Sequence, residues 1–489
     1  MHEDGAAARR RWRRHPARAR PLPRARTGAL SAGLLCLLAL APCAMAQEEQ
    51  QARRAGEVFA EVLQFLLENY VDETRLNPET LLDGALEGMF EALDDPHSAY
   101  VQPSDVRQIT DLTRGEFGGV GMYIGRHADG GFEVISPIEG NPAHRAGVRA
   151  GDLIMAINGE SAAEFDLADI VARLRGPPGT TVTMTLLRDG SIEFDTVMER
   201  EMIEVETVRF GMIGERIGYL RIVQFTLLTP ERVSEALHEL DGAAALIIDL
   251  RSNPGGLLGS VVQVADYFLS DGVIVSTQAR VDADNDVHRA GPAATIVDAS
   301  VPIVILIDRG SASASEILAA ALGESGRGFL LGEQSYGKAS VQQVRRFGSR
   351  AVKLTTAYYL TPSGASIDQV GISPHLAFGD TQRTEEEEAE ITELFEGGHI
   401  RRFVREHADP SEALIEEFIS ELRDSGVDLP RRMLRKLVHD EVVRRMPERP
   451  VYDLRFDGVL REAVRMLDLD LVPARDAWQL REPAAAAAF

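Results

Sequence analysis

The chain of 489 residues contains only two cysteines, Cys36 and Cys43, and both lie within the first 46 residues. The rest of the chain therefore has no thiol, which excludes disulfides, cysteine-ligated zinc and a thiol nucleophile from it. Lysine is also scarce: Lys338, Lys353 and Lys436 are the only three among 52 basic residues. Since arginine cannot lose its proton in a protein, each lysine invites the question of what it does that arginine cannot do.

The first 46 residues differ from the rest in composition. Nine arginines precede a short apolar stretch, GALSAGLLCLLALAP (28–42), and the small residues AMA follow at 44–46. This order predicts a signal peptide cleaved after Ala46, because the apolar part is too short to span a membrane. We therefore expect a periplasmic or secreted protein, with an uncleaved inner-membrane tether and a lipoprotein anchored at Cys43 as the alternatives.

Beyond residue 46 the chain is strongly acidic. The whole chain has a formal net charge of −24, and its first 46 residues carry nine arginines against Glu3 and Asp4, which leaves −31 for the remainder. Such a charge repels the phosphate backbone, so the composition argues against nucleic acid as a partner.

Hydrophobic patterning divides the remaining chain into four regions. Residues 47–113 are predicted to be helical, because apolar residues recur three and four apart, and Asp94-Asp95-Pro96 ends the second helical segment. Residues 114–201 hold short β-rich runs between glycines, with one helix at 166–176, and predict a compact β module. Residues 381–489 are predicted to be charged amphipathic helices to about 482, followed by a frayed tail.

The fourth region, residues 202–380, alternates apolar strands with helices. The runs at 244–250 and 301–309 are apolar throughout, as in strands that are buried on both faces of a sheet. Residues 257–270 and 313–326 are predicted to be the helices that cover them. This pattern predicts an α/β layer.

Three serines alternate just ahead of an alanine-rich run: Ser311, Ser313 and Ser315. Ser313 and Glu316 fit the capping-box pattern, so a helix cap is the simplest interpretation. A serine between a strand and a helix is also a typical position for a nucleophile, because a helix N-terminus favours developing negative charge. The serines alone leave both interpretations open.

A serine nucleophile needs a base. None of the nine histidines beyond residue 46 lies in a motif that suggests catalysis. Lys338, within GEQSYGKASVQQ, can act as the base if burial lowers its pKa, and a surface lysine is the alternative. The turn DLRSNPGGLLG (249–259) can bring the amides of Gly255 and Gly256 to a ligand oxygen, as an oxyanion site requires, or it can be a plain turn.

Five segments occur together in one order: GGVGMYIG…PAHRAGVRAGDLIMAING, IGYLRIVQF, DLRSNPGGLL, GSASASEILAAAL and GEQSYGKASVQ. This order resembles the carboxyl-terminal processing peptidases, or tail-specific proteases, which are exported Ser/Lys proteases. The resemblance covers roughly residues 60 to 378 and implies a multi-domain α/β fold. Its parts would be a crotonase-like α/β protease core, an inserted PDZ β-module, and helical N- and C-terminal regions.

The resemblance also assigns catalytic roles. Ser313 would be the nucleophile, Lys338 the base, and Gln342 the residue that orients the lysine amine. Ser311 and Ser315 would then form local hydrogen bonds. The reaction would pass through an acyl-enzyme and needs neutral Lys338, which burial alone can provide near neutral pH.

The oxyanion would be bound by the amides of Ala314 and of the Gly255-Gly256 turn, and the family uses neither a metal nor a cofactor. One departure is GISPHL, where His375 replaces the usual acidic residue at a position that is not catalytic.

The β module would be the PDZ domain. FGGVGM (117–122) resembles its carboxylate-binding loop, in which Gly119, Val120, Gly121 and Met122 capture the C-terminus of a peptide that adds a strand to the sheet. The expected partners are protein substrates with apolar C-termini; an adaptor protein and self-association through the C-terminal helices are further options. Two other functions stay open: a silent PDZ scaffold that binds tails without cutting, and a crotonase-fold enzyme acting on an acyl thioester.

Overall fold

The computed structural model describes residues 30–127, 130–188, 190–379, 384–446, 449–468, 471–474 and 477–480. The chain forms two compact units, Met1–Met89 and Phe90–Phe489. Within the first, the structure describes helix α1 (Leu30–Asn69), the short turn η1 (Glu73–Arg75) and most of α2 (Pro78–Glu91). Of the predicted signal peptide, residues 1–29 lie outside the described residues and 30–46 form the start of α1.

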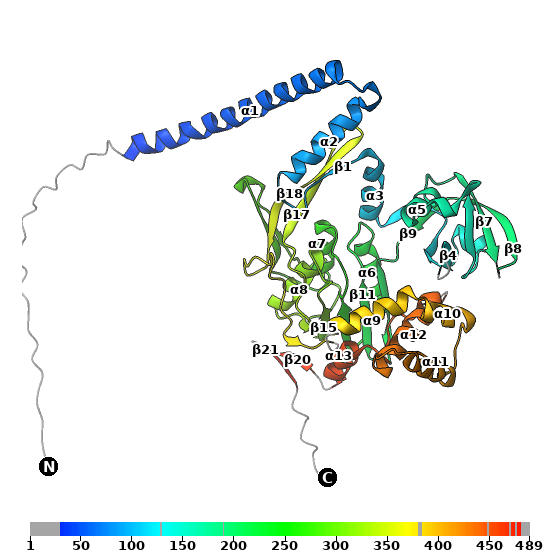
Figure 1. Cartoon of the computed structure of the whole chain (residues 1–489). Coiled ribbons are helices and arrows are strands. Elements are labelled where there is room, and N and C mark those ends of the chain that lie inside the picture. The colour runs from blue at the N-terminus through cyan, green and yellow to red at the C-terminus, as the bar shows by residue number, and fades with distance from the viewer. Residues whose placement is uncertain are drawn as a thin grey trace, which may run out of the picture. The chain divides into compact units, whose positions relative to one another are not determined.

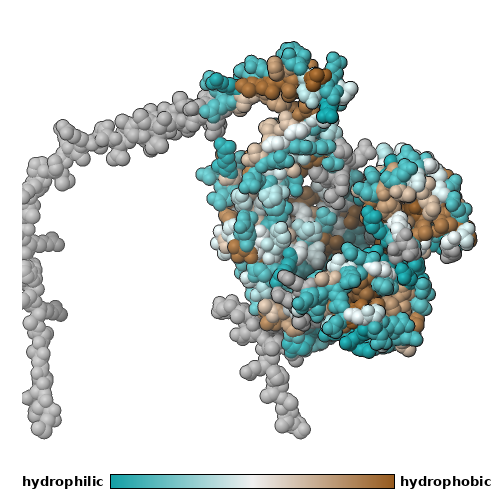
Figure 2. All heavy atoms as spheres, viewed as in Figure 1, coloured by the Kyte–Doolittle hydropathy of each residue, from teal (hydrophilic) through white to brown (hydrophobic). Residues whose placement is uncertain are grey.

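An apolar stripe runs along the second half of α1, and Figure 2 shows hydrophobic residues gathered on this helix. Its exposed members have the spacing of one helix face: Val58, Phe59, Val62, Phe65 and Leu66. Among the described residues, no helix combines the length and the apolar character needed to cross a membrane.

Residues 202–380 are built on a six-stranded sheet in the order β10-β11-β12-β15-β16-β19. The strands are β10 (Val208–Ile213), β11 (Ile217–Ile222), β12 (Ala245–Asp249), β15 (Ile303–Ile307), β16 (Phe329–Gly332) and β19 (Leu376–Ala377). Only β10 is antiparallel to its neighbour, and the other pairs are parallel. The predicted apolar runs thus form adjacent parallel strands, whose carboxyl ends meet at one edge of the sheet.

Helices cover both faces of this sheet (Figure 1). They are α6 (Thr229–Glu239), α7 (Leu258–Asp266) and α8 (Ala314–Glu324) on one face and α13 (Gly458–Asp468) on the other. Successive residues of β12 serve both faces, since Ile248 packs with α7 and α8 while Ile247 packs with α13. The end of the C-terminal helical region is therefore part of the core of this six-stranded sheet.

A second, antiparallel sheet was not predicted from the sequence. It joins β1 (Ala99–Val101), β13 (Val273–Ala279), β14 (Val287–Arg289), β17 (Ser340–Phe347) and β18 (Arg350–Leu360). Many residues of β17 and β18 are exposed or half-buried, so these strands lack the continuous apolar run that marks the main sheet. β1 pairs with β18, with Ala99 opposite Lys353.

The β module is inserted after α3 (Pro103–Arg114). The chain enters it through β2 (Glu116–Gly119) and leaves through β9 (Glu201–Glu204), and these two strands pair with each other. Its sheet runs β3-β4-β5-β7-β8, with β6 paired to β5. The elements are β3 (Met122–Arg126), β4 (Phe132–Pro137), α4 (Pro142–Arg145), β5 (Leu153–Ile157), β6 (Glu160–Ser161), α5 (Leu167–Leu174), β7 (Thr181–Arg188) and β8 (Ile192–Glu199).

The C-terminal region forms a helical cluster with its own apolar core. Its helices are α9 (Glu385–Glu396), α10 (His399–Glu406), α11 (Glu412–Asp424) and α12 (Arg431–Arg445). Helix was expected to about residue 482, but β20 (Leu471–Ala474) pairs there with β21 (Ala477–Leu480). Pro473 disfavours helix at this point, because proline lacks the amide hydrogen that a helix interior needs.

A buried ion-pair network joins the helical cluster to the β module. Arg445 contacts Glu133 of β4 and Glu441 of α12, both at 2.9 Å. All three side chains are almost fully buried, with exposed fractions of 12%, 3% and 2%. Removing the cation would leave the buried Glu133 carboxylate without a charge partner among the described residues, whereas Glu441 would keep its ion pair with Arg444 at 2.8 Å.

We predict that Arg445→Ala lowers the free energy of unfolding by about 3 to 5 kcal/mol, measured by chemical denaturation. Arg465→Ala is the matched control, because its ion pair with Glu462 lies at the surface and contributes at most about 1 kcal/mol. Equal losses of unfolding free energy in the two variants would contradict the conclusion that this buried network holds the helical cluster to the β module.

Candidate active site

Ser313 lies between strand β15 and helix α8 in a strained backbone conformation. Its φ is 55° and its ψ is −115°, a combination that a residue with a side chain seldom adopts. Strain of this kind costs about 1 to 3 kcal/mol and persists only where the surroundings enforce it, typically at active sites. Because α8 begins at the next residue, the Ser313 hydroxyl lies at the positive end of a helix.

The two neighbouring serines are fully buried and bonded to the backbone. The Ser311 hydroxyl donates to the Leu250 carbonyl at 2.8 Å, and the Ser315 hydroxyl donates to the Asn253 carbonyl at 3.0 Å. Both bonds join the serine segment to the turn that follows β12. Ser313 forms the predicted capping box with Glu316 at the start of α8. Burial raises the pKa of Tyr359, and a hydrogen bond with the Ser313 side chain opposes that rise.

The carboxylate of Glu316 connects the candidate nucleophile with the candidate base. Its Oε2 accepts from the Ser313 N–H at 2.8 Å and from the Lys338 N–H at 2.9 Å. Its Oε1 accepts from the Ser335 hydroxyl at 2.6 Å and from the Gly337 N–H at 2.7 Å. Glu316 is fully buried, so these four bonds fix the two loops against each other without competition from water.

The surroundings of Lys338 favour its neutral form. Burial lowers the pKa of Lys338, and the positive charge of Lys353 lowers it further. The negative charges of Asp95 and Glu316 act in the opposite direction, yet the pKa stays below the usual value for lysine. A lysine of lowered pKa is a stronger candidate for a general base at neutral pH than an exposed one.

The turn after β12 lies directly against Ser313. A β-carbon added to Gly255 would lie 2.7 Å from the Ser313 Cβ and 2.9 Å from the Ala314 nitrogen, and one added to Gly256 would lie 2.0 Å from the Phe225 oxygen. With φ of 98° and 145°, both positions require glycine. The predicted oxyanion residues Gly255, Gly256 and Ala314 are therefore placed beside the candidate nucleophile.

Asn253 organises that turn and decides which amides are free to bind a ligand. Fully buried, it donates through Nδ2 to the Ile222 carbonyl at 2.8 Å and accepts from the Gly255 N–H at 2.9 Å. The Gly255 amide is thus already engaged. This favours Ala314, at the first position of α8, and Gly256 as the donors to an oxyanion.

Gln342 lies at the start of β17, opposite Thr355 of β18. Its side-chain Nε2 donates to the Thr355 Oγ1 at 3.4 Å rather than contacting the Lys338 amine directly. His375 takes no part in this cluster, because its Nδ1 accepts from the Leu330 N–H at 2.8 Å near the far end of α8. Burial lowers the pKa of His375.

The predicted carboxylate-binding loop lines a cavity of about 990 Å³. Gly119, Val120, Gly121 and Met122 all contribute to its wall. The carbonyls of Val120 and Gly121 accept bonds from Ala143 and Ile138. In a trans peptide the next N–H points the opposite way, so the amides of Gly121 and Met122 face away from that segment. The free edge of β3 borders the same cavity, as strand addition requires.

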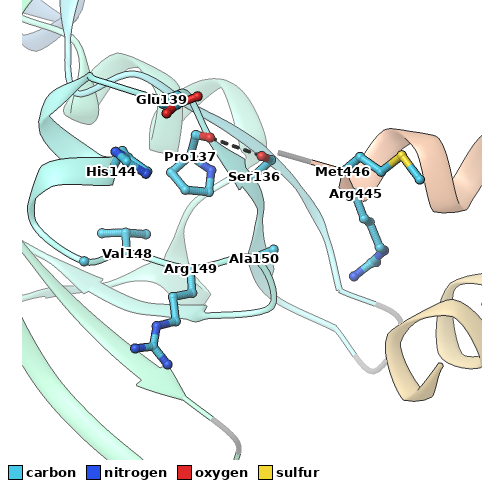
Figure 3. A pocket seen from close by; sticks show the side chains of 10 residues that line it. Ser136, Pro137, Glu139, His144, Val148, Arg149, Ala150, Arg445 and Met446 are labelled. Carbon is cyan, nitrogen blue, oxygen red and sulfur yellow. Dashed lines mark hydrogen bonds between the residues drawn. The ribbon is translucent and has the colours of Figure 1, made fainter. Parts of the chain in front are cut away.

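The C-terminal region contributes to the walls of the β module's cavities. Met446 and Arg449 line the 990 Å³ cavity. A second cavity of about 730 Å³ is lined by His144, Val148 and Arg149 of the module and by Arg445 and Met446 (Figure 3). The residues that follow α12 are therefore placed to influence what this module binds.

From the sequence, Glu316 was predicted only as a partner in a helix cap, and its bonds to the Lys338 loop were missed. The available signal was a single acidic residue inside an alanine-rich apolar run, since an acid on a buried helix needs a structural or chemical reason. Asn253 was also overlooked, although an amide within a glycine-rich turn commonly bonds to nearby backbone.

Comparisons with known proteins match three parts of the chain. Residues 216–378 match the model for peptidase family S41, residues 133–188 match a PDZ domain, and residues 41–104 match the activating protease CtpB N-terminal domain. A solved structure titled photosystem II D1 C-terminal processing protease is 30% identical, covering 66% of this chain and 92% of that one, with a TM-score of 0.39.

The alignments with two curated relatives cover most of the length of each relative. The carboxy-terminal-processing protease of Bartonella bacilliformis is 38% identical over 348 residues, or 70% of this chain and 79% of that protein. Carboxy-terminal processing protease CtpB of Bacillus subtilis is 35% identical over 342 residues, or 68% of this chain and 70% of that protein. The chain therefore belongs to the carboxy-terminal processing proteases, which are serine-type peptidases with a PDZ domain.

Proposed function

We propose that the protein is an exported endopeptidase that cleaves other proteins by a Ser313/Lys338 dyad. The observation that carries this proposal is the single Glu316 oxygen that accepts from the backbone N–H of both residues. Export is supported by the basic and apolar segments ahead of Ala46. We place the protein in the periplasm or outside the cell.

In the first half of the reaction, the neutral Lys338 amine takes the proton of the Ser313 hydroxyl while Oγ attacks the carbonyl carbon of the scissile bond. The carbonyl oxygen becomes an oxyanion, which the amides of Ala314 and Gly256 stabilise. The C–N bond then breaks, and the departing amine takes the proton from the Lys338 ammonium. This leaves an acyl ester on Ser313.

In the second half, Lys338 takes a proton from water, and the resulting hydroxide attacks the ester carbonyl. The second oxyanion occupies the same site and collapses as Ser313 leaves with the proton held by Lys338. Gln342 orients the lysine amine between the steps. Because only 6% of Ser313 is exposed, we further propose that movement of the PDZ domain opens the site to substrate.

The dyad is tested with purified residues 47–489 and an unstructured protein that ends in apolar residues. We expect Ser313→Ala and Lys338→Ala each to reduce cleavage by at least about 10³-fold while circular dichroism stays unchanged. Ser311→Ala is the control for the wrong serine: it loses a buried bond to the Leu250 carbonyl that helps to place the site, so cleavage should fall but remain measurable. Cleavage that survives Ser313→Ala would overturn the proposal.

We also propose that the PDZ cavity binds the free carboxylate of an apolar substrate tail. Two substrates with the same body, ending in Ala-Val-Val or Asp-Asp-Asp, are compared by steady-state kinetics. KM should be at least about tenfold higher for the acidic tail with kcat little changed, because the tail supplies binding away from the reacting bond.

Gly121→Val should abolish this preference, because φ at Gly121 is +70° and a β-carbon there would lie 2.4 Å from the Asn141 Cβ. Gly159→Ala is the control: it lies in the same module at a positive φ, with open space around it and away from the cavity. A preference that is the same in both variants and the parent would refute tail recognition at this loop.

A further inference from the structure

The segment Asp95–Ser98 lies next to the strand that carries Thr355. Strand β1, which begins at Ala99, pairs with β18 so that Ala99 is opposite Lys353. This pairing places Ser98 beside Thr355, and the Ser98 Oγ accepts from the Thr355 N–H at 2.9 Å. From the sequence, Asp94-Asp95-Pro96 indicated only the end of a helix. The bond between Ser98 and Thr355 shows that the residues after this helix also contact β18.

A chain of hydrogen bonds leads from Asp95 to the residue that is expected to orient Lys338. The Asp95 carboxylate accepts from the His97 N–H at 2.9 Å and from the Ser98 hydroxyl at 2.6 Å. Ser98 is nearly buried and holds Thr355, whose Oγ1 in turn accepts from the Gln342 Nε2 at 3.4 Å. The segment before β1 therefore supports Thr355, the residue to which the Gln342 side chain donates.

We propose that Asp95 is a positioning residue for the peptidase reaction, acting through Ser98 and Thr355 to hold Gln342 in place for the Lys338 amine. This inference rests on the proposed Ser313/Lys338 mechanism. Asp95 itself touches neither substrate nor nucleophile. Its effect reaches the reaction through the orientation of one amide side chain and through its own negative charge.

The negative charge of Asp95 affects the pKa of Lys338, which a purely structural residue would not do. Burial raises the pKa of Asp95, but hydrogen bonds from Ser98, His97 and Thr355 outweigh it and keep the pKa below its usual value. The charged Asp95 raises the pKa of Lys338, together with Glu316 of α8, while burial and Lys353 of β18 lower it. Removing this one charge should lower the pKa of Lys338 further.

The base works when Lys338 is neutral, so kcat/KM rises as pH increases through the pKa of Lys338. In Asp95→Asn that rising limb should move to lower pH. At a pH above the rising limbs of both the parent and Asp95→Asn, kcat/KM of the variant should still be roughly 10- to 100-fold lower than that of the parent. The reason is that Gln342 loses its support, and a misplacement of the Lys338 amine by about 1 Å is costly.

Two further variants separate charge from position. Thr355→Val removes the Oγ1 that accepts from Gln342 but keeps the backbone N–H bonded to Ser98. It also removes the bond from the Thr355 side chain to Asp95, which stays charged through its bonds from His97 and Ser98, so kcat should fall without a shift of the rising limb. Asp94→Asn is the matched control, because Asp94 is exposed and its φ of 51° suits asparagine. It should change kcat/KM less than twofold at every pH.

The decisive experiment is the pH profile of kcat/KM for the parent and these three variants, with melting temperatures recorded for each. An Asp95→Asn profile that matches Asp94→Asn, or a loss in Asp95→Asn without a shift of the limb, would overturn the inference. If the parent's activity survives Ser313→Ala, the proposed mechanism itself has failed, which is a separate outcome from the failure of Asp95.

Discussion

The arrangement of the candidate active site depends on one buried carboxylate. Glu316 lies three residues after Ser313, on the first turn of α8, and its two oxygens accept four hydrogen bonds from the loops that carry Ser313 and Lys338. A buried charge is stable only when its hydrogen-bonding capacity is met, so the loops cannot move apart without exposing an unsatisfied carboxylate. The same contact helps to hold Ser313 at its strained backbone angles.

The main sheet supplies the second constraint. β12 and β15 are adjacent and parallel, so the Gly255-Gly256 turn after one and the serine segment after the other begin at the same edge. Buried bonds from Ser311, Ser315 and Asn253 fasten the two segments together. The candidate nucleophile, oxyanion donors and base thus come from three loops that converge at the carboxyl ends of parallel strands.

Sequence patterning predicted the parts of this fold with strong local signals. The continuous apolar runs became β12 and β15, and the segments after them became α7 and α8. The antiparallel sheet of β17 and β18 was missed, because its half-exposed strands carry no apolar run and its partner β1 is distant in sequence. Helix was wrongly predicted at 471–480, where Pro473 favours the extended conformation.

For the site, the family resemblance supplied Ser313, Lys338 and Gln342, but the groups that hold them could not be predicted. Glu316 bonds to residues 19 to 22 positions later in the chain, and Asp95 bonds to Ser98, which in turn bonds to Thr355 on a distant strand. Local sequence pattern does not reveal such long-range bonds. A helix cap is sufficient to explain Glu316, and the end of a helix is sufficient to explain Asp95.

The most direct test of this account is the activity of Glu316→Gln on an unstructured protein substrate, with Glu324→Gln as the control from the exposed end of the same helix. Glutamine has nearly the same shape but cannot accept four bonds, since its amide nitrogen would face two donors. The account predicts a loss of kcat/KM of at least about 100-fold in a protein that remains folded, with the control unchanged. Activity within twofold of the parent would contradict it.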